Sequence, residues 1–139
     1  WAMHAALPAE QRQRTDWVAG ILGVMLFERG DSAAADLLTS YQPPTCSALE
    51  SRTAFTRRLC ITRAWLAADS GTCSLPSATP PQATEMAEAD RNWWLAWWLL
   101  GKRCMGADAS GADAAIAALG EGRTLPSWLA ARMKSVALD

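Results

Sequence analysis

Apolar residues recur every three or four positions in several windows of the chain, which is the spacing of one face of an α-helix. No window alternates apolar and polar residues for long enough to predict a strand. The pattern predicts six helices, over about 9–29, 32–41, 46–68, 84–105, 113–119 and 125–138.

Glycine and proline residues mark the ends of these helices. Gly30 follows the first helix in a position that favours a left-handed turn, so the first two helices are expected to form a tight hairpin. Pro43 and Pro44 end the second helix, and Thr45 is expected to cap the third. The segment 69–83 is rich in Ser, Thr, Gly and Pro, and we expect it to be the longest loop.

The composition supports the same fold class. The chain holds 28 alanines but only six valines and isoleucines together, and alanine favours helices whereas β-branched residues favour strands. With 139 residues, half of them hydrophobic, the chain can build one ordinary core. We therefore expect a single all-α domain over 1–139, a compact bundle of about six helices arranged as antiparallel hairpins and stapled by disulfides.

The charges exclude some classes of partner. The net charge is -1, so no global field draws the chain to nucleic acid or to an anionic membrane.

The apolar stretch 17–27 is far shorter than the roughly 20 residues of a transmembrane helix. We expect this stretch to belong to the core, where Gly20 and Gly23 permit close contact with another helix.

Trp97, Leu100 and Gly101 form a Trp-x-x-Leu-Gly motif, and the alanine-rich segment 114–119 follows it. This arrangement resembles the opening of a repeat of the tetratricopeptide family. An earlier segment is similar in its spacing, through Leu22, Gly23, Gly30, Asp31 and Ala35. The two segments cover less than half of the chain, and the resemblance implies packing as helical hairpins.

The four cysteines predict two disulfides. Cys46 and Cys60 would be about 21 Å apart in one continuous helix, which is too far for a bond between them. If the third and fourth helices form an antiparallel hairpin, Cys46 lies level with Cys104, and the loop after the third helix can return Cys73 to Cys60. We therefore expect the pairs Cys46–Cys104 and Cys60–Cys73, with four reduced core cysteines as the alternative.

Two disulfides would place the chain in an oxidising compartment, the periplasm or the extracellular space. The cysteines show no Cys-x-x-Cys or Cys/His spacing that would predict a zinc site or a redox motif. The bias towards Ala, Arg and Trp favours a bacterial source. The chain begins at Trp1 without a signal peptide, which is the form expected of a mature exported protein and equally of a trimmed one.

The segment 93–100 consists of eight consecutive apolar residues and covers the whole circumference of its helix. Four of them are the tryptophans Trp93, Trp94, Trp97 and Trp98. They are either core residues of a central helix or an aromatic surface that binds a protein or an apolar ligand. We expect at least one of them, Trp94 or Trp98, to lie at the edge of the core.

Other candidate side chains have structural explanations that we prefer. A solvated face explains the arginines of the third helix, which are Arg52, Arg57, Arg58 and Arg63. Helix capping and the helix dipole explain the carboxylates Glu85, Glu88 and Asp90. The one histidine is His4, so no catalytic triad, metal site or cofactor site can be written.

These observations favour a non-catalytic exported helical module that binds another protein, as an adaptor, subunit, inhibitor or immunity-type protein does. The alternative is a carrier of an apolar or aromatic ligand in a tryptophan-lined pocket. An exposed apolar patch favours the protein binder, and an enclosed cavity against the tryptophan helix favours the carrier.

Overall fold

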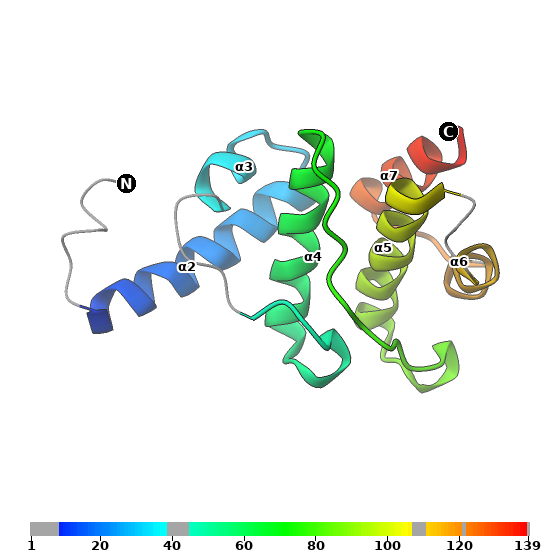
Figure 1. Cartoon of the computed structure of the whole chain (residues 1–139), viewed down its shortest axis with the longest axis horizontal. Helices are drawn as coiled ribbons and strands as arrows, with labels where there is room; N and C mark the ends of the chain where they lie inside the picture. The colour runs from blue at the N-terminus through cyan, green and yellow to red at the C-terminus, as the bar shows by residue number, and fades with distance from the viewer. Residues whose placement is uncertain (1–8, 39–44, 107–110, 121, 139) are drawn as a thin grey trace.

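The computed structural model describes residues 9–38, 45–106, 111–120 and 122–138, and the side chains among them from Trp17 to Val136. These ranges hold α-helices and two short 3-10 helices and no strand, so the all-α class is confirmed (Figure 1). The α-helices are α2 (Ala9–Glu28), α3 (Ala33–Leu38), α4 (Ala54–Asp69), α5 (Glu88–Met105), α6 (Ala112–Gly120) and α7 (Ser127–Leu138). The 3-10 helices are η1 (Leu49–Ser51) and η2 (Ala83–Glu85).

The expected hairpin between the first two helices is present as α2 and α3. Gly30 adopts a φ of 71° after α2, a value that glycine tolerates without strain. The Asp31 carboxylate then accepts a hydrogen bond of 2.9 Å from the amide of Ala33 and so caps α3. The helices approach closely at Gly23, where any side chain would overlap Leu38. The expected end of the second helix near Tyr41 lies outside the described residues.

The third helix begins later than the sequence pattern predicts. Thr53 is the N-cap of α4, because its hydroxyl accepts a hydrogen bond of 3.2 Å from the amide of Thr56. Before it, Ala48 adopts a left-handed conformation and the chain turns through η1. Thr45 therefore caps no helix here, and Cys46 lies in an irregular segment ahead of α4.

The helices α4 and α5 run parallel, so the expected antiparallel hairpin of the third and fourth helices is wrong. Their beginnings, middles and ends are joined in register by Arg57 with Asp90, Trp65 with Ala96, and Asp69 with Arg103. The connection over 70–87 passes back along the helices, as the green trace in Figure 1 shows. An extended residue spans about 3.3 Å but a helical residue only 1.5 Å, so this connection is long enough for the return.

Hydrogen bonds fix the returning segment against the helices. The Trp97 indole donates a hydrogen bond of 2.8 Å to the carbonyl of Pro76. The amide of Leu49 donates one of 3.1 Å to the carbonyl of Ser77. The segment thus supplies acceptors for groups of α5 and η1, and its residue Pro76 is itself buried.

The disulfides are Cys46–Cys60 and Cys73–Cys104, each with Cα atoms 5.6 Å apart. The expected pairs Cys46–Cys104 and Cys60–Cys73 are therefore wrong. They depended on a continuous helix from Cys46 to Cys60 and on an antiparallel hairpin, and neither exists. The irregular segment before α4 folds back to Cys60, and the parallel arrangement places the ends of α4 and α5 together, next to Cys73.

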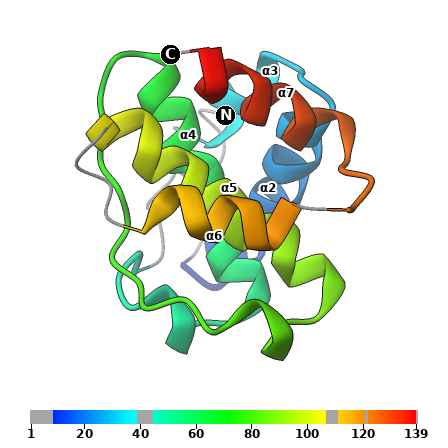
Figure 2. The ribbon, with the colours of Figure 1, turned by 90° about the vertical axis from the view of Figure 1, so that its right-hand side faces the viewer.

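The helix α5 has neighbours on most of its sides. The helix α6 runs antiparallel to it, since Lys102 pairs with Asp113 at one end and Arg123, just beyond α6, donates to Asn92 at the other. The helix α7 lies beside α5 and reaches α2 (Figure 2). Its residue Trp128 contacts Phe27 of α2, with ring centroids 5.6 Å apart. The buried residues of α2 to α7 form one contiguous hydrophobic cluster.

Candidate functional site

The tryptophans of α5 are mostly core residues. Trp93, Trp94 and Trp97 are buried, and Trp98 is half-buried at the edge of the core. An edge tryptophan was expected at Trp94 or Trp98; it is Trp98, whose ring packs edge-on against Trp97 with centroids 4.9 Å apart. Trp94 is covered by the guanidinium group of Arg57, 5.4 Å from the ring centroid. The helix α5 therefore offers a partner much less aromatic surface than its sequence suggests.

The exposed apolar surface lies on α2 instead. Trp17, Val18, Leu22 and Met25 are 58%, 49%, 47% and 44% exposed, and we call them the α2 stripe. Val18, Leu22 and Met25 follow one another at i, i+4 and i+7, so their side chains share one helix face. The stretch 17–27 was expected to be core, and this is wrong for one of its faces.

The α2 stripe is exposed because the apolar residues of 17–27 lie on all sides of α2, as those of 93–100 do in α5. The opposite face of α2 is buried through residues such as Ala19, Val24 and Phe27. Among the described elements, α2 packs on α3, α4 and α7. In Figure 1, α2 lies at one side of the described helices. The residues of the α2 stripe are therefore not covered by these neighbours and remain exposed.

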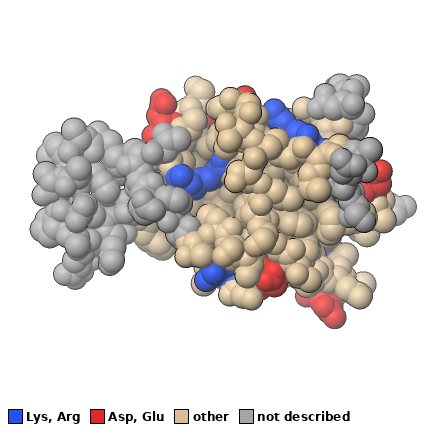
Figure 3. Space-filling view, viewed as in Figure 1, with Lys and Arg blue, Asp and Glu red and all other residues tan. Residues whose placement is uncertain are grey.

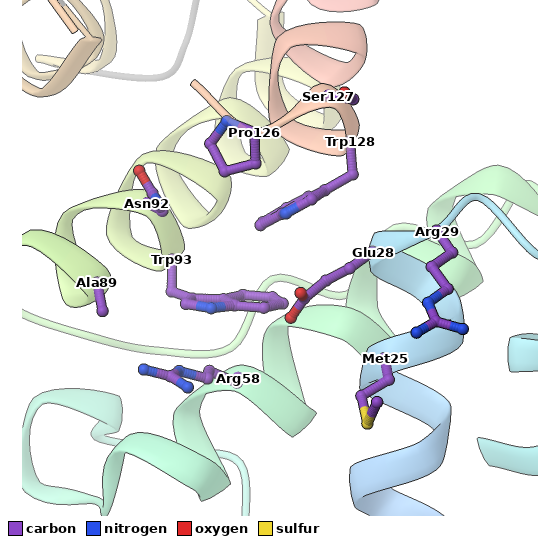
Figure 4. Close-up of a pocket in the computed structure, with 10 residues that line it drawn as sticks. All are labelled: Met25, Glu28, Arg29, Arg58, Ala89, Asn92, Trp93, Pro126, Ser127 and Trp128. Carbon is purple, nitrogen blue, oxygen red and sulfur yellow. The ribbon is translucent and has the colours of Figure 1, made fainter. Parts of the chain in front are cut away.

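A cleft of about 460 Å³ adjoins the α2 stripe at Met25. It is formed where α2, α4, α5 and the start of α7 meet (Figure 4). Its lining combines apolar and polar side chains, from Met25, Glu28, Arg29, Arg58, Ala89, Asn92, Trp93, Pro126, Ser127 and Trp128. The rings of Trp93 and Trp128 lie against each other with centroids 4.7 Å apart. The cleft is open to solvent and differs from the enclosed apolar cavity expected of a carrier.

Two oppositely charged groups face the cleft. The Nε atom of Arg58 is buried and has no hydrogen-bond partner among the described residues. Burial raises the pKa of the Glu28 carboxyl group above its ordinary value, although the positive charge of Arg58 opposes the rise. Figure 4 shows the Glu28 carboxyl group at the tip of the Trp93 ring and the Arg58 guanidinium group below that ring.

The four arginines that were expected to form a solvated face are half-buried and bind in different places. Arg52 and Arg57 donate hydrogen bonds to carbonyls of the segment before α4, and Arg63 donates to the carbonyl of Leu38. Only Arg58 points into the cleft described above. As expected, these arginines do not converge on one anion. Arg52 and Arg57 bind the segment before α4 and Arg63 binds the end of α3, so these three guanidinium groups donate to backbone carbonyls instead of forming a solvated face.

The carboxylates that were expected in the first turns of the fourth helix have separate positions, because α5 begins at Glu88 rather than near residue 84 and Glu85 belongs to η2. Asp90 lies 3.6 Å from the Arg57 guanidinium group and pairs with it. Glu85 and Asp90 line a second cavity of about 330 Å³, together with Glu50. Glu88 is in the first turn of α5, where a negative charge favours the helix dipole.

A polar cluster ties the ends of α4 and α5 to the middle of α7. Asp69 at the end of α4 accepts hydrogen bonds of 2.7 Å from Arg103 of α5 and 2.8 Å from Arg132 of α7. Both guanidinium groups also lie over the Trp65 ring, at 5.6 and 4.7 Å from its centroid. Burial raises the pKa of the Asp69 carboxyl group, but the two arginines together lower it by more, so the net shift is downward.

We expect Asp69→Asn to lower the free energy of unfolding by about 1 kcal/mol at neutral pH, because the pairs are partly exposed and screened. The pKa of Asp69 is below its ordinary value of 3.8 in the folded state. Its contribution is therefore complete above that value and is lost as the pH falls through the folded-state pKa. Urea unfolding of both proteins at neutral and acidic pH should show the difference between them shrink below about pH 4.

The control for this prediction is Asp113→Asn. Asp113 pairs with Lys102, but its side chain is 83% exposed, so its loss should change stability by no more than about 0.5 kcal/mol. A difference between wild type and Asp69→Asn that stays constant with pH would show that the carboxylate of Asp69 carries no charge-dependent stabilisation.

The surface carries no large patch of one charge on the face shown in Figure 3, where Lys and Arg alternate with Asp and Glu among uncharged residues. Among the residues that the structure describes, no group of three or more His, Cys, Asp and Glu could hold a metal ion. In the same part of the chain, no helix is both long enough and apolar enough to cross a membrane. His4 lies outside this part.

Comparison of the chain with protein-family models, with curated proteins and with solved structures finds no match. The segments that resemble tetratricopeptide repeats lie in the pairs α2–α3 and α5–α6, which pack as hairpins. The family itself stays a prediction.

Proposed function

We propose that the chain is a non-catalytic, exported protein-binding module, and that the α2 stripe is its contact surface. The observation that carries this proposal is the exposure of Trp17, Val18, Leu22 and Met25 on one helix. Large contiguous apolar patches on a folded protein are typical of interaction sites, whereas single exposed apolar residues are not.

The geometry of the stripe favours a helix of another protein as the partner. Side chains at i, i+4 and i+7 form a ridge that fits the groove of a second helix laid along it. The α2 stripe, which adds Trp17 to this ridge, spans about 12 Å of helix axis, or little more than two turns. Trp17 is already anchored against Phe55, with ring centroids 6.1 Å apart, so one of the largest contact groups is held in place before binding.

The two disulfides support the compartment that we propose, the periplasm or the extracellular space of a bacterium. All four cysteines are paired, and disulfides persist in oxidising compartments. The parallel arrangement of α4 and α5 depends on a long connection, and Cys73–Cys104 ties that connection to α5. The module would therefore keep its shape outside the cell.

The test is a partner captured through Leu22 and then titrated in pure form. A photo-reactive residue at position 22 should crosslink the partner in the native extract, and mass spectrometry would identify it. Leu22→Lys should then weaken binding of the purified partner by at least about 30-fold, as expected of a central hot spot. Calorimetric titration and thermal melting would be measured on the same samples.

Met105→Lys is the matched control, because Met105 is 49% exposed and lies on α5 away from the stripe. Both variants should keep the stability of the wild type within about 0.5 kcal/mol, since both residues face solvent. A captured partner that binds Leu22→Lys and Met105→Lys equally well would refute the α2 stripe as the contact surface. If the crosslink captured only a second copy of this chain, the α2 stripe would be a self-assembly surface, and the proposal of a different partner protein would be refuted.

A further inference from the structure

The cleft beside Met25 has features that the α2 stripe lacks. It is concave, and its volume of about 460 Å³ is within the range of pockets that hold small molecules. Its wall combines two tryptophan rings with a cation and an anion, contributed by different helices. A partner protein with a flat surface would not reach the side chains at the floor of this cleft.

Arg58 indicates the first requirement of an occupant. A buried N–H group without a hydrogen-bond partner is rare and costs free energy, more so when the group is charged. The Nε atom of Arg58 has no such partner among the described residues, and the Arg58 side chain lines the cleft. A guanidinium group presents its N–H groups in a planar fork that matches the two oxygens of a carboxylate. The occupant should therefore carry a carboxylate.

Glu28 indicates the second requirement. Glu28 lines the cleft, and its carboxyl group lies at the tip of the Trp93 ring, where the residue is exposed to solvent (Figure 4). A carboxylate in this position can accept charge-assisted hydrogen bonds from a cationic group that enters the cleft. The occupant should therefore carry an ammonium group as well as a carboxylate.

The tryptophans indicate the third requirement. Trp93 is buried and Trp128 is half-buried, and their rings, with Met25 and Pro126, form the apolar part of the wall. An apolar side chain placed here would gain contact with rigid aromatic surface. We propose that the cleft binds a free α-amino acid with an apolar side chain, its carboxylate on Arg58, its ammonium group on Glu28 and its side chain against the Trp93–Trp128 wall.

A ligand series on the unchanged protein tests this proposal. L-Phenylalanine carries all three groups, 3-phenylpropionate lacks the ammonium group and phenethylamine lacks the carboxylate. Calorimetry and protein NMR should show that L-phenylalanine binds at least about 10-fold more tightly than either analogue, since each analogue loses a charge-assisted contact. Equal affinities for L-phenylalanine and 3-phenylpropionate, or no binding of any probe at millimolar concentration, would overturn the proposal.

Variants assign the two charged contacts. Arg58→Gln should lower the affinity for L-phenylalanine at least about 10-fold. Glu28→Gln should lower the affinity for L-phenylalanine to that of 3-phenylpropionate, and it should leave the affinity for 3-phenylpropionate unchanged. Arg52→Gln is the control, since Arg52 donates to the carbonyl of Ser47 and does not line the cleft. Unchanged binding by Arg58→Gln with an unchanged melting temperature would contradict the assignment.

This inference does not depend on the proposed protein-binding function. Leu22 does not line the cleft, so Leu22→Lys should bind L-phenylalanine as the wild type does. The protein-binding proposal and the amino-acid-binding proposal are therefore tested by separate measurements, and one can be refuted while the other holds.

Discussion

Replacement of Trp65 by alanine is expected to lower the free energy of unfolding by about 3 to 5 kcal/mol. Trp65 is fully buried, and its indole donates a hydrogen bond of 3.0 Å to the carbonyl of Ala96. It joins α4 to α5 at the middle of their parallel contact, where alanine would leave a large cavity. Urea unfolding followed by circular dichroism would measure the loss.

Trp98→Ala is the control for this prediction. Trp98 is half-buried at the edge of the same core, so its truncation leaves a site open to water rather than a closed cavity. We expect a loss of no more than about 1.5 kcal/mol. Equal losses for the two variants would show that Trp98 is a core residue and that α5 has no edge on that side.

Trp65→Phe separates packing from hydrogen bonding. Phenylalanine keeps most of the buried ring but cannot donate to Ala96, so the loss should be clearly smaller than for alanine. The guanidinium groups of Arg103 and Arg132 would still face a ring. A loss for Trp65→Phe as large as for Trp65→Ala would mean that the indole hydrogen bond, rather than volume, determines the stability of this contact.

The sequence pattern predicts the helices well because their signals are local. Gly30 ends α2 and Asp31 caps α3 through contacts within a few residues, so the hairpin is visible in the sequence. The start of α4 was misplaced by about eight residues because Thr45 and Thr53 are both suitable caps. The choice of Thr53 accompanies the turn at Ala48 and the contacts of Leu49 with the returning segment, which are not local.

The direction of α5 relative to α4 is not a local property. The connection over 70–87 is long enough for either direction, and no periodicity in it distinguishes them. The hydrogen bond from Trp97 to Pro76 and the pairing of Arg103 with Asp69 exist only in the parallel arrangement. Both disulfide errors follow from this one choice and from the misplaced start of α4.

The candidate site shows the same limit. Both α2 and α5 contain an apolar stretch that covers the whole circumference of the helix. The sequence alone does not say which of the two is surrounded by other helices. The helix α5 packs on α4, α6 and α7, whereas α2 lies at the side of the bundle. The position of a helix within the fold decides which of its apolar faces stays exposed, and here α2 carries the exposed face.

The loss of either disulfide is the other change with a large expected effect. The bond Cys46–Cys60 closes a loop with a sequence separation of 14, and Cys73–Cys104 closes one of 31. The loop-entropy model gives about 3.0 kcal/mol for the first and about 3.7 kcal/mol for the second. Paired serine substitutions, Cys46→Ser with Cys60→Ser and Cys73→Ser with Cys104→Ser, should lower the free energy of unfolding by these amounts in denaturant titrations.

The accessibility of the sulfur atoms gives a second, independent measurement of the same two bonds. Cys60 is almost fully buried, whereas Cys73 is exposed, so a mild reductant should reach Cys73–Cys104 first. Alkylation during partial reduction should therefore label Cys73 and Cys104 before Cys46 and Cys60, and peptide mapping would follow each pair. Mapping without reduction that finds Cys46 linked to Cys104 would contradict the parallel arrangement of α4 and α5, because that link requires the opposite direction of α5.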